Sequence, residues 1–338
     1  MTLSVDPDVE RGSASAPLPA PERGQRPGLR SRMAVRTALD REASWRPRWF
    51  WGALAAPGGL WMLLFFLVPF YVVVCIAFGG IDPLFRTPKP AWDPLFWTGN
   101  NFSFTWQELT GRLAFLGAPI LRTIWYTAAA SILAMLIGYP VAYFVARYGG
   151  RRKALYLVAL IAPFFVSYMM RMLAWIDLLQ VNGYVNSIIH AFGLGRVNWL
   201  DGKPITVILG LVYGYIPYLI VVLYAGLDRI DERHLEAARD LGLSRTQTFV
   251  HVTLPLSRPT LLAGGIVTVL PMLGDYYTNQ LLSGSPHTTM IGNVIEGELG
   301  NPLLVGQGGA LSVLMLIVLL IPLVYYVRQT AKASAERA

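Results

Sequence analysis

Six long apolar segments constrain the fold of this chain more than any other feature of its sequence. A helix that crosses a bilayer needs about 20 predominantly apolar residues. The segments that reach this length lie near Pro57–Phe78, Ile120–Ala146, Ala154–Leu178, Pro204–Leu227, Thr260–Leu282 and Gly309–Val327. Each contains proline, which membrane bundles tolerate because neighbouring helices and hydroxyl side chains satisfy the freed carbonyl groups. The pattern predicts an all-α membrane protein with six transmembrane helices.

The low charge content supports this fold class, and the placement of the charges predicts the orientation. Only 14% of the residues are charged, whereas soluble domains carry about 25%. Nine arginines precede the first apolar segment, and most of the other basic residues lie in the second and fourth loops and at the C-terminus. Cytoplasmic flanks of membrane proteins are enriched in Arg and Lys. Both termini are therefore expected in the cytoplasm.

The chain is expected to divide into a tail and one membrane domain. Residues 1–48 are rich in Pro, Ala, Ser, Gly and Arg, with almost no large apolar residues, which predicts a disordered basic cytoplasmic tail because such a segment cannot offset its ordering entropy. Residues 49–338 hold the six-helix domain. Basic tails also bind nucleic acid, but the enrichment of basic residues in cytoplasmic flanks explains this tail. We therefore expect membrane lipid as a partner and no nucleic acid.

Residue types that carry catalysis or bind metals are scarce. Cys75 is the only cysteine and lies in an apolar segment, while the four histidines show no metal-ligand spacing. No Gly-rich loop followed by Lys-Ser or Lys-Thr is present, so this chain lacks the usual phosphate-binding loop of ATPases. We therefore expect no catalytic residue, no metal site and no cofactor, and any ATP that drives the protein is expected to bind to a separate chain.

The loop between the fourth and fifth apolar segments carries signals for two short helices. Asp231 is expected to cap the first helix, and Gly242 to end it, because glycine adopts the left-handed conformation at little cost. Ser244 and Gln247 form a capping-box pair for the second, which Pro255 is expected to stop. Two helices joined by glycine also occur in DNA-binding helix-turn-helix motifs, but membrane spans on both sides leave no room for a folded DNA-binding domain.

This loop, about residues 228–259, resembles the EAA loop of permeases from bacterial binding-protein-dependent ABC importers, and we call it the EAA loop. The pattern of Glu-Ala-Ala, a glycine, an aliphatic residue and Leu-Pro is matched by Glu236, Ala237, Ala238, Gly242, Val252, Leu254 and Pro255. The family commonly has Ile where this chain has Val252. The resemblance implies that this loop carries a coupling helix that inserts into a groove of the ATPase subunit. The ATPase-coupling residues that it implies are Glu236, Ala237, Ala238, Gly242, Leu254 and Pro255.

Further runs resemble the spermidine/putrescine branch of that family. They are Tyr139–Arg147, Pro163–Asn186, Gly274–Gly284 and Met290–Ile295. The resemblance implies a multi-pass, non-catalytic permease subunit in the bacterial inner membrane. It would work with an ATP-binding cassette ATPase dimer, a second permease subunit and an extracytoplasmic substrate-binding protein. Iron, thiamine, sulfate and opine permeases share parts of these runs, so the substrate stays open between a polyamine and these alternatives.

An ion-coupled secondary transporter is the alternative from another class of membrane protein. Such transporters often carry inverted repeats and broken helices. The sequence shows no clear repeat, and an EAA loop has no role in that mechanism. The importer permease is therefore the favoured interpretation.

Two ionisable residues fall at membrane depth, where such residues are costly and often functional. At 1.5 Å per residue, Asp275 lies roughly 22 Å along the fifth span and Arg171 roughly 25 Å along the third. Their depths match, so an ion pair between them and a direct role in the substrate pathway are equally open. Carboxylates beside aromatic rings suit the ammonium groups of a polyamine. The remaining candidate pathway residues are Asp177, near the outer mouth, and Trp175, Tyr168 and Tyr276.

Overall fold

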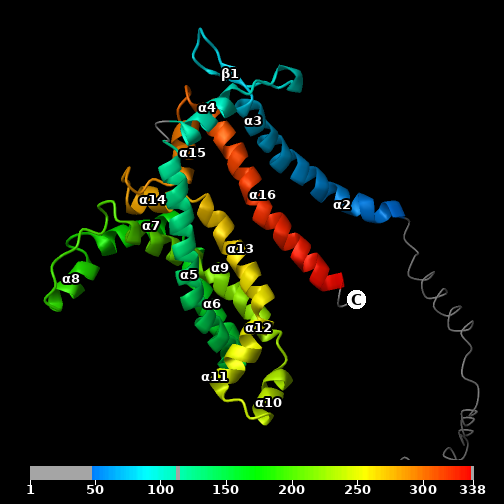
Figure 1. Ribbon diagram of the computed structural model, residues 1–338, viewed down its shortest axis with the longest axis vertical. Helices are drawn as coiled ribbons and strands as arrows, with labels where there is room; N and C mark the ends of the chain where they lie inside the picture. The colour runs from blue at the N-terminus through cyan, green and yellow to red at the C-terminus, as the bar shows by residue number, and fades with distance from the viewer. Residues whose placement is uncertain (1–47, 112–114, 336–338) are drawn as a thin grey trace, which may run out of the picture. The chain divides into compact units, whose positions relative to one another are not determined.

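The computed structural model describes residues 48–111 and 115–335, and helices dominate this part of the chain (Figure 1). The tail expected over residues 1–48 lies outside the described residues except for Arg48. The chain divides into two units, residues 1–66 and residues 67–338. In the first unit, α2 (Arg48–Met62) leads into a π-helical turn at Leu63–Leu67. The large apolar side chains of α2 are exposed, as expected for a helix surrounded by lipid or by another chain.

The second unit contains one small hairpin and the remaining helices. The hairpin pairs β1 (Gly80–Ile81) antiparallel with β2 (Pro88–Lys89). The helices are α3 (Val68–Ala77), α4 (Asn100–Thr110), α5 (Gly117–Tyr148), α6 (Lys153–Ile161), α7 (Tyr168–Leu179), α8 (Tyr184–Ala191), α9 (Pro204–Asp228), α10 (Glu232–Asp240), α11 (Arg245–Thr248), α12 (Leu254–Leu256), α13 (Arg258–Leu273), α14 (Tyr277–Leu282), α15 (Ile291–Leu299) and α16 (Val305–Ala335). Short 3-10 turns lie at Pro94–Phe96, Gly150–Arg152 and Ala162–Phe165, and a second π-helical turn lies at Phe249–Thr253.

Among the described residues, four helical stretches are long and apolar enough to cross a membrane unbroken: Trp49–Ala77, Gly117–Tyr148, Pro204–Asp228 and Val305–Gln329. Two bent pairs bring the total to six if each counts as one span. They are Gly150–Phe165 with Tyr168–Ala191, bent by 87°, and Arg245–Leu256 with Arg258–Leu273, bent by 63°. The prediction of an all-α, multi-span membrane protein is confirmed.

The third and fifth spans differ from the straight helices that the sequence predicts. In the third, Pro163 lies in the 3-10 turn between α6 and α7, where it supplies no backbone N–H to continue the ladder. In the fifth, α13 ends at Leu273, and Leu282 belongs to the separate helix α14. The break falls at Gly274 and Asp275, two residues that favour helix ends rather than helix interiors.

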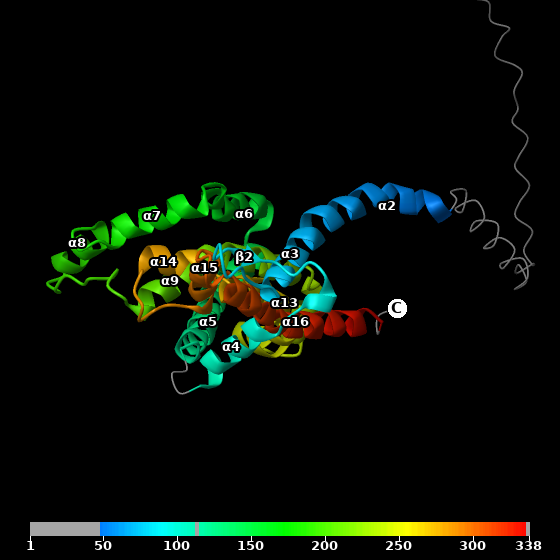
Figure 2. The ribbon, with the colours of Figure 1, turned by 90° about the horizontal axis from the view of Figure 1, so that it is seen from above.

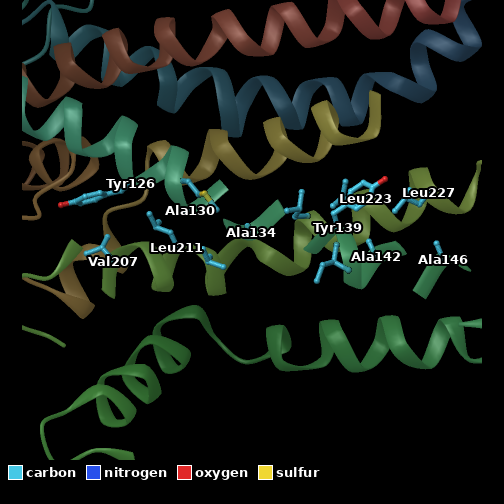
Figure 3. Close-up of a cluster of buried hydrophobic side chains, with 14 of the residues drawn as sticks. Tyr126, Ala130, Ala134, Tyr139, Ala142, Ala146, Val207, Leu211, Leu223 and Leu227 are labelled. Carbon is cyan, nitrogen blue, oxygen red and sulfur yellow. The ribbon is translucent and has the colours of Figure 1, made fainter. Parts of the chain in front are cut away.

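The core of the second unit lies along the contact between α5 and α9, with α13 packed beside them (Figures 1 and 2). Figure 3 shows small residues of α5, among them Ala130, Ala134 and Ala142, beside the buried leucines of α9, such as Leu211 and Leu223. Small residues allow membrane helices to approach closely, which increases their van der Waals contact. The close packing of these three helices fixes the position of the break in the fifth span relative to α9.

Candidate functional site

The break between α13 and α14 places a buried carboxylate at its centre. Asp275 is only 7% exposed. Its Oδ1 accepts a hydrogen bond from the backbone N–H of Thr278 at 2.9 Å, so it satisfies one of the free donors at the start of α14. The local sequence therefore explains why the chain pauses here: a glycine ends one helix, and an aspartate begins the next.

The second oxygen of the Asp275 carboxylate gathers hydroxyl groups from three helices. Oδ2 accepts hydrogen bonds from Tyr168 of α7 at 3.3 Å, Tyr215 of α9 at 3.0 Å and Thr278 of α14 at 2.6 Å. Tyr168 and Thr278 also contact each other through their hydroxyl groups. All of these donors are neutral, so among the described residues the carboxylate is held in position and oriented without a cationic partner.

A cavity of about 380 Å³ opens beside this carboxylate. Its wall consists of aromatic rings, two glycines, a proline and one acid, namely Tyr168, Gly214, Tyr215, Tyr218, Pro271, Gly274, Asp275, Tyr276 and Tyr277. Gly214 is required by the fit of the Tyr168 ring, because a Cβ at position 214 would lie 3.0 Å from the ring and its hydroxyl group. One negative charge surrounded by ring faces attracts an organic cation through Coulomb and cation–π interactions.

Arg171 does not form the ion pair with Asp275 that its sequence position allowed. Within the described residues, the one ion pair joins Lys153 and Asp228 at 2.6 Å. The guanidinium of Arg171 instead faces the rings of Phe164, Tyr168 and Tyr213, with its central carbon 4.1, 5.3 and 5.7 Å from the ring centroids. The depth estimate for Arg171 assumed a straight third span, and the 87° bend before α7 removes that assumption.

The other predicted pathway residues lie in three different surroundings. Tyr276 lines the cavity, and its ring packs on that of Tyr277 with centroids 4.3 Å apart. Trp175 packs edge-on against Tyr213, at 5.3 Å, and so belongs to the aromatic surroundings of Arg171. Asp177 is exposed, accepts a hydrogen bond from Gln180 at 3.1 Å and does not line the cavity.

Sequence reasoning missed two residues that hold the carboxylate. Thr278 follows Asp275 by three residues, which is a local capping signal that could have identified it. Tyr215 lies 60 residues away on α9, and no local pattern links it to Asp275. The packing of α9 against α13 and α14, on either side of the break, brings the two side chains together.

A network of amides fixes the break from its other side. Asn293 of α15 donates a hydrogen bond to the backbone carbonyl of Tyr276 at 2.9 Å and accepts one from Asn279 at 2.8 Å. Gly292 permits this approach, because a Cβ there would lie 2.9 Å from the carbonyl oxygen of Gly274. The unwound segment is therefore clamped by α15 as well as by the tyrosines.

The EAA loop forms the two short helices that its caps predict. Asp231 accepts from the backbone N–H of Arg233 at 3.0 Å, and Gly242 adopts a left-handed φ of +89°. Ser244 and Gln247 complete a reciprocal capping box. In α10, Ala238 is buried, whereas Glu236 and Ala237 are exposed. The face of the helix that carries Glu236 and Ala237 is therefore not covered by other described residues.

The expectation that Pro255 stops the second helix is wrong. Helical structure continues from α11 through the π-helical turn at Phe249–Thr253 into α12, where Pro255 occupies the first turn. Pro255 has no backbone N–H to continue the ladder, and it lies just after the π-helical turn, where regular α-helical hydrogen bonding is already interrupted. The direction of the chain changes after α12, at Ser257, between the two arms of the 63° bend.

The EAA loop is anchored to the core through aromatic and polar contacts. The ring of Phe249 packs edge-on against Tyr139 and Tyr143 of α5, with centroids 5.8 and 5.1 Å apart. Leu254 packs against the same buried cluster. Arg147 donates to the carbonyl groups of Leu227 and Ile230, at 3.1 and 3.0 Å, and so holds the end of α9 against α5.

A pair of carboxylates, Glu108 in α4 and Glu298 in α15, lies away from the predicted spans. Burial and the nearby carboxylate of Glu108 raise the pKa of Glu298 to about 7. Burial also raises the pKa of Glu108. Oε2 of Glu298 is buried and has no hydrogen-bond partner among the described residues. Within the same part of the chain, no group of three or more His, Cys, Asp or Glu residues is placed to hold a metal ion.

The chain is similar to transport proteins over most of its length. Residues 134–333 match the family model of the binding-protein-dependent transport system inner membrane component. The chain is 30% identical over 269 residues to the spermidine/putrescine transport system permease protein PotB of Escherichia coli K12, covering 79% of this chain and 93% of that protein. The protein of the same name from Haemophilus influenzae is 30% identical over 276 residues, covering 79% and 89%.

A solved structure shares the fold. A chain in the bacterial alginate ABC transporter, in complex with its alginate pentasaccharide-bound periplasmic protein, superposes with a TM-score of 0.65 at 18% sequence identity. The superposition covers 82% of this chain and 92% of that chain.

Proposed function

This chain belongs to the family of binding-protein-dependent transport system inner membrane components, and from that membership we propose that it conducts polyamines, spermidine or putrescine, into the cell. It is a multi-pass inner-membrane permease subunit of an ABC importer and belongs to a class of proteins that are not themselves enzymes. The observation that carries the proposal is the buried Asp275 carboxylate, whose hydrogen-bond donors within the described part of the chain are all neutral and which faces an aromatic cavity.

The chemistry of this cavity suits a flexible organic cation better than a neutral or anionic solute. A carboxylate removed from bulk water exerts a stronger Coulomb attraction than an exposed one. The ring faces of Tyr168, Tyr215 and Tyr276 add cation–π contacts to an ammonium group. Hydrogen bonds from three hydroxyl groups hold the carboxylate in a fixed orientation beside the cavity, where an ammonium group can approach it.

We place the drive for transport outside this chain. An ATP-binding cassette ATPase dimer would bind the EAA loop, with Glu236 and Ala237 on the exposed face of α10 as contact residues. A second permease subunit would complete the pathway, and an extracytoplasmic binding protein would deliver the substrate. The distribution of basic residues supports a cytoplasmic location for the EAA loop and both termini, and we propose residues 1–48 as a cytoplasmic tail and residues 49–338 as the permease domain.

The test is uptake by cells that cannot synthesise polyamines and that express the complete transporter. We expect saturable, ATP-dependent uptake of labelled spermidine or putrescine, inhibited by an excess of either unlabelled polyamine. Uptake that is inhibited by iron chelates, thiamine or an opine, but not by polyamines, would assign the permease to another substrate branch. Transport that follows an ion gradient without the ATPase subunit would contradict the importer mechanism.

A further inference from the structure

The Arg171 side chain occupies an unusual environment for a cation. It is only 8% exposed, and its Nε and Nη1 atoms are buried without a hydrogen-bond partner among the described residues. Burial of an ionised group without an acceptor is costly. The surroundings consist of ring faces, which we call the aromatic cage: Phe164, Tyr168 and Tyr213, with Trp175 packed against the ring of Tyr213.

The aromatic cage shares a wall with the Asp275 cavity. The hydroxyl group of Tyr168 donates to Asp275, whereas the ring of the same residue faces the guanidinium of Arg171. One tyrosine therefore separates a carboxylate without a cation from a cation without an anion. The space beside Asp275 and the space that Arg171 now fills are therefore two neighbouring places that each suit a cation. A substrate with two or more ammonium groups along an extended chain needs two such places.

We propose that the aromatic cage is a second cation subsite of the permeation pathway and that Arg171 fills it in this state. The subsite takes an alkylammonium group of the substrate once the Arg171 side chain has left. Departure costs the Arg171 side chain no hydrogen bond, because the side chain forms none with the described residues, and it exposes the guanidinium to acceptors. This inference rests on the proposed polyamine substrate and adds a place for its second charge.

The test measures the preference of the cage for cations directly. Arg171→Cys is made in a Cys75→Ser background. The variant is assembled with the ATPase and the second permease subunit, and the complex is reconstituted in lipid nanodiscs. The thiol is then modified either by a trimethylammonium-bearing or by a neutral methanethiosulfonate reagent of similar size. An exposed site outside the EAA loop, Lys89→Cys in the same background, gives the reference ratio of the two rates. We expect the cationic reagent to be favoured about tenfold over this reference, as cation–π attraction at a desolvated site implies.

Two additions link the preference to the cage and to the substrate. Phe164→Leu removes the ring nearest to Arg171 and is expected to return the rate ratio to the reference value. Millimolar spermidine is expected to slow modification by either reagent. A ratio equal to the reference with Phe164 present, or a ratio unchanged by Phe164→Leu, overturns the proposal.

A matched pair of variants guards against a purely structural role. Arg171→Met keeps the side-chain length without the charge, and Arg171→Lys keeps the charge. We expect Arg171→Met to assemble in wild-type yield, because it leaves no acceptor unpaired. If only Arg171→Lys assembles, Arg171 is a structural cation and the cage proposal fails.

The proposed function is tested separately by spermidine uptake in the wild-type transporter. Absence of uptake overturns the polyamine assignment, whereas a cation preference that persists at the cage supports a subsite for a different organic cation. Normal uptake together with a reference-level rate ratio overturns the cage alone.

Discussion

Tyr139 in α5 and Ser257, at the bend between α12 and α13, share a hydrogen bond of 2.8 Å across 118 residues of sequence. Both residues are buried. Ser257 donates its own proton to the carbonyl oxygen of Leu254 at 3.0 Å, so the Tyr139 hydroxyl is the donor in the shared bond. The end of the EAA loop is thus tied to the helix that forms most of the core.

Tyr139→Phe removes this tie and leaves the ring in place. We expect the free energy of unfolding to fall by about 1 kcal/mol, the usual net value of one buried hydrogen bond. We also expect the substrate-loaded binding protein to stimulate ATP hydrolysis less than in the wild type. Tyr143→Phe is the matched control, since the Tyr143 ring also packs on Phe249 but its hydroxyl group forms no side-chain hydrogen bond within the described residues. Equal stimulation in Tyr139→Phe and the wild type would show that the bond plays no part in coupling.

Gly242→Val is expected to disturb the turn between α10 and α11. The backbone there has a φ of +89°, although a Cβ would meet no atom within 4 Å, so the penalty is conformational rather than steric packing. A left-handed conformation costs an ordinary L-residue about 1–2 kcal/mol, and a β-branched residue tolerates it least. The measurement is the amount of ATPase subunit that copurifies with the permease.

Gly242→Asn serves as the control for that variant, because asparagine adopts the left-handed region readily. It should retain the ATPase subunit. If both variants lose the ATPase equally, the side chain itself disturbs the interface and the positive φ is not the cause.

Asp275→Asn is expected to lower polyamine uptake at least tenfold while the complex still assembles. The amide has no charge to attract an ammonium group, and a tenfold change corresponds to about 1.4 kcal/mol. Assembly survives because the present partners of the carboxylate are neutral hydroxyl groups, so no buried charge is orphaned. The measurement combines uptake of labelled spermidine with the yield of purified complex.

The double variant Asp275→Asn with Arg171→Gln distinguishes this outcome from the ion pair that the sequence allowed. With no such pair in the structure, Asp275→Asn should already assemble, and the second change should not restore uptake. Poor assembly of Asp275→Asn that the second change corrects would instead establish an Arg171–Asp275 pair in another state of the transporter.

The Glu108–Glu298 pair predicts a pH-dependent stability. Because the pKa of Glu298 rises from 4.5 to about 7 on folding, the folded protein binds more protons than the unfolded chain between these values. Stability therefore falls as the pH rises through this window and stays low above about pH 7. Thermal unfolding of the purified complex should show a lower melting temperature at about pH 8 than at about pH 5.

Glu298→Gln should flatten that pH profile and raise the melting temperature on the alkaline side, since the amide cannot ionise. Glu296→Gln, at an exposed position of the same helix, is the matched control and should keep the wild-type slope. An unchanged slope in Glu298→Gln would assign the pH dependence to other groups.

Thiol labelling in intact cells tests the orientation. Cys75 is buried, and Cys75→Ser provides the background. Single changes at Arg151 and Ser244 should be shielded from an impermeant reagent, whereas a cysteine at Lys89 should react, because the basic loops are expected inside the cell. Arg151 is preferable to Gly150, whose positive φ of 49° makes it unsuitable for a side chain. Labelling at Ser244 from outside would reverse the topology.

Local patterns predicted local structure well in this chain. The capping signals at Asp231, Gly242 and Ser244 each correspond to a helix end in the structure. Segment length and polarity identified the spans, because a bilayer imposes a minimum apolar length on every helix that crosses it. The EAA pattern found the right loop, although Pro255 proved to lie within helical structure.

Relationships between distant segments could not be predicted in the same way. The rise per residue placed Arg171 at the depth of Asp275, but this holds only for a straight helix, and the third span is bent by 87°. Tyr215 reaches Asp275 because α9 packs against α14, a contact with no periodic signature. The carboxylate was identifiable from its position in the chain, whereas its partners depended on tertiary packing.

The 63° bend at Ser257 determines how a displacement of the EAA loop would reach Asp275. A push along the axis of a straight span would slide the whole helix through its neighbours, against the close packing of the core. Across a bend, the same push acts sideways on the near end of α13 and tends to rotate this helix. Over the 16 residues of α13, about 24 Å, a rotation of about 5° moves the far end by about 2 Å. The bend therefore converts a displacement of the EAA loop into a lateral movement of the end of α13 that lies next to Asp275.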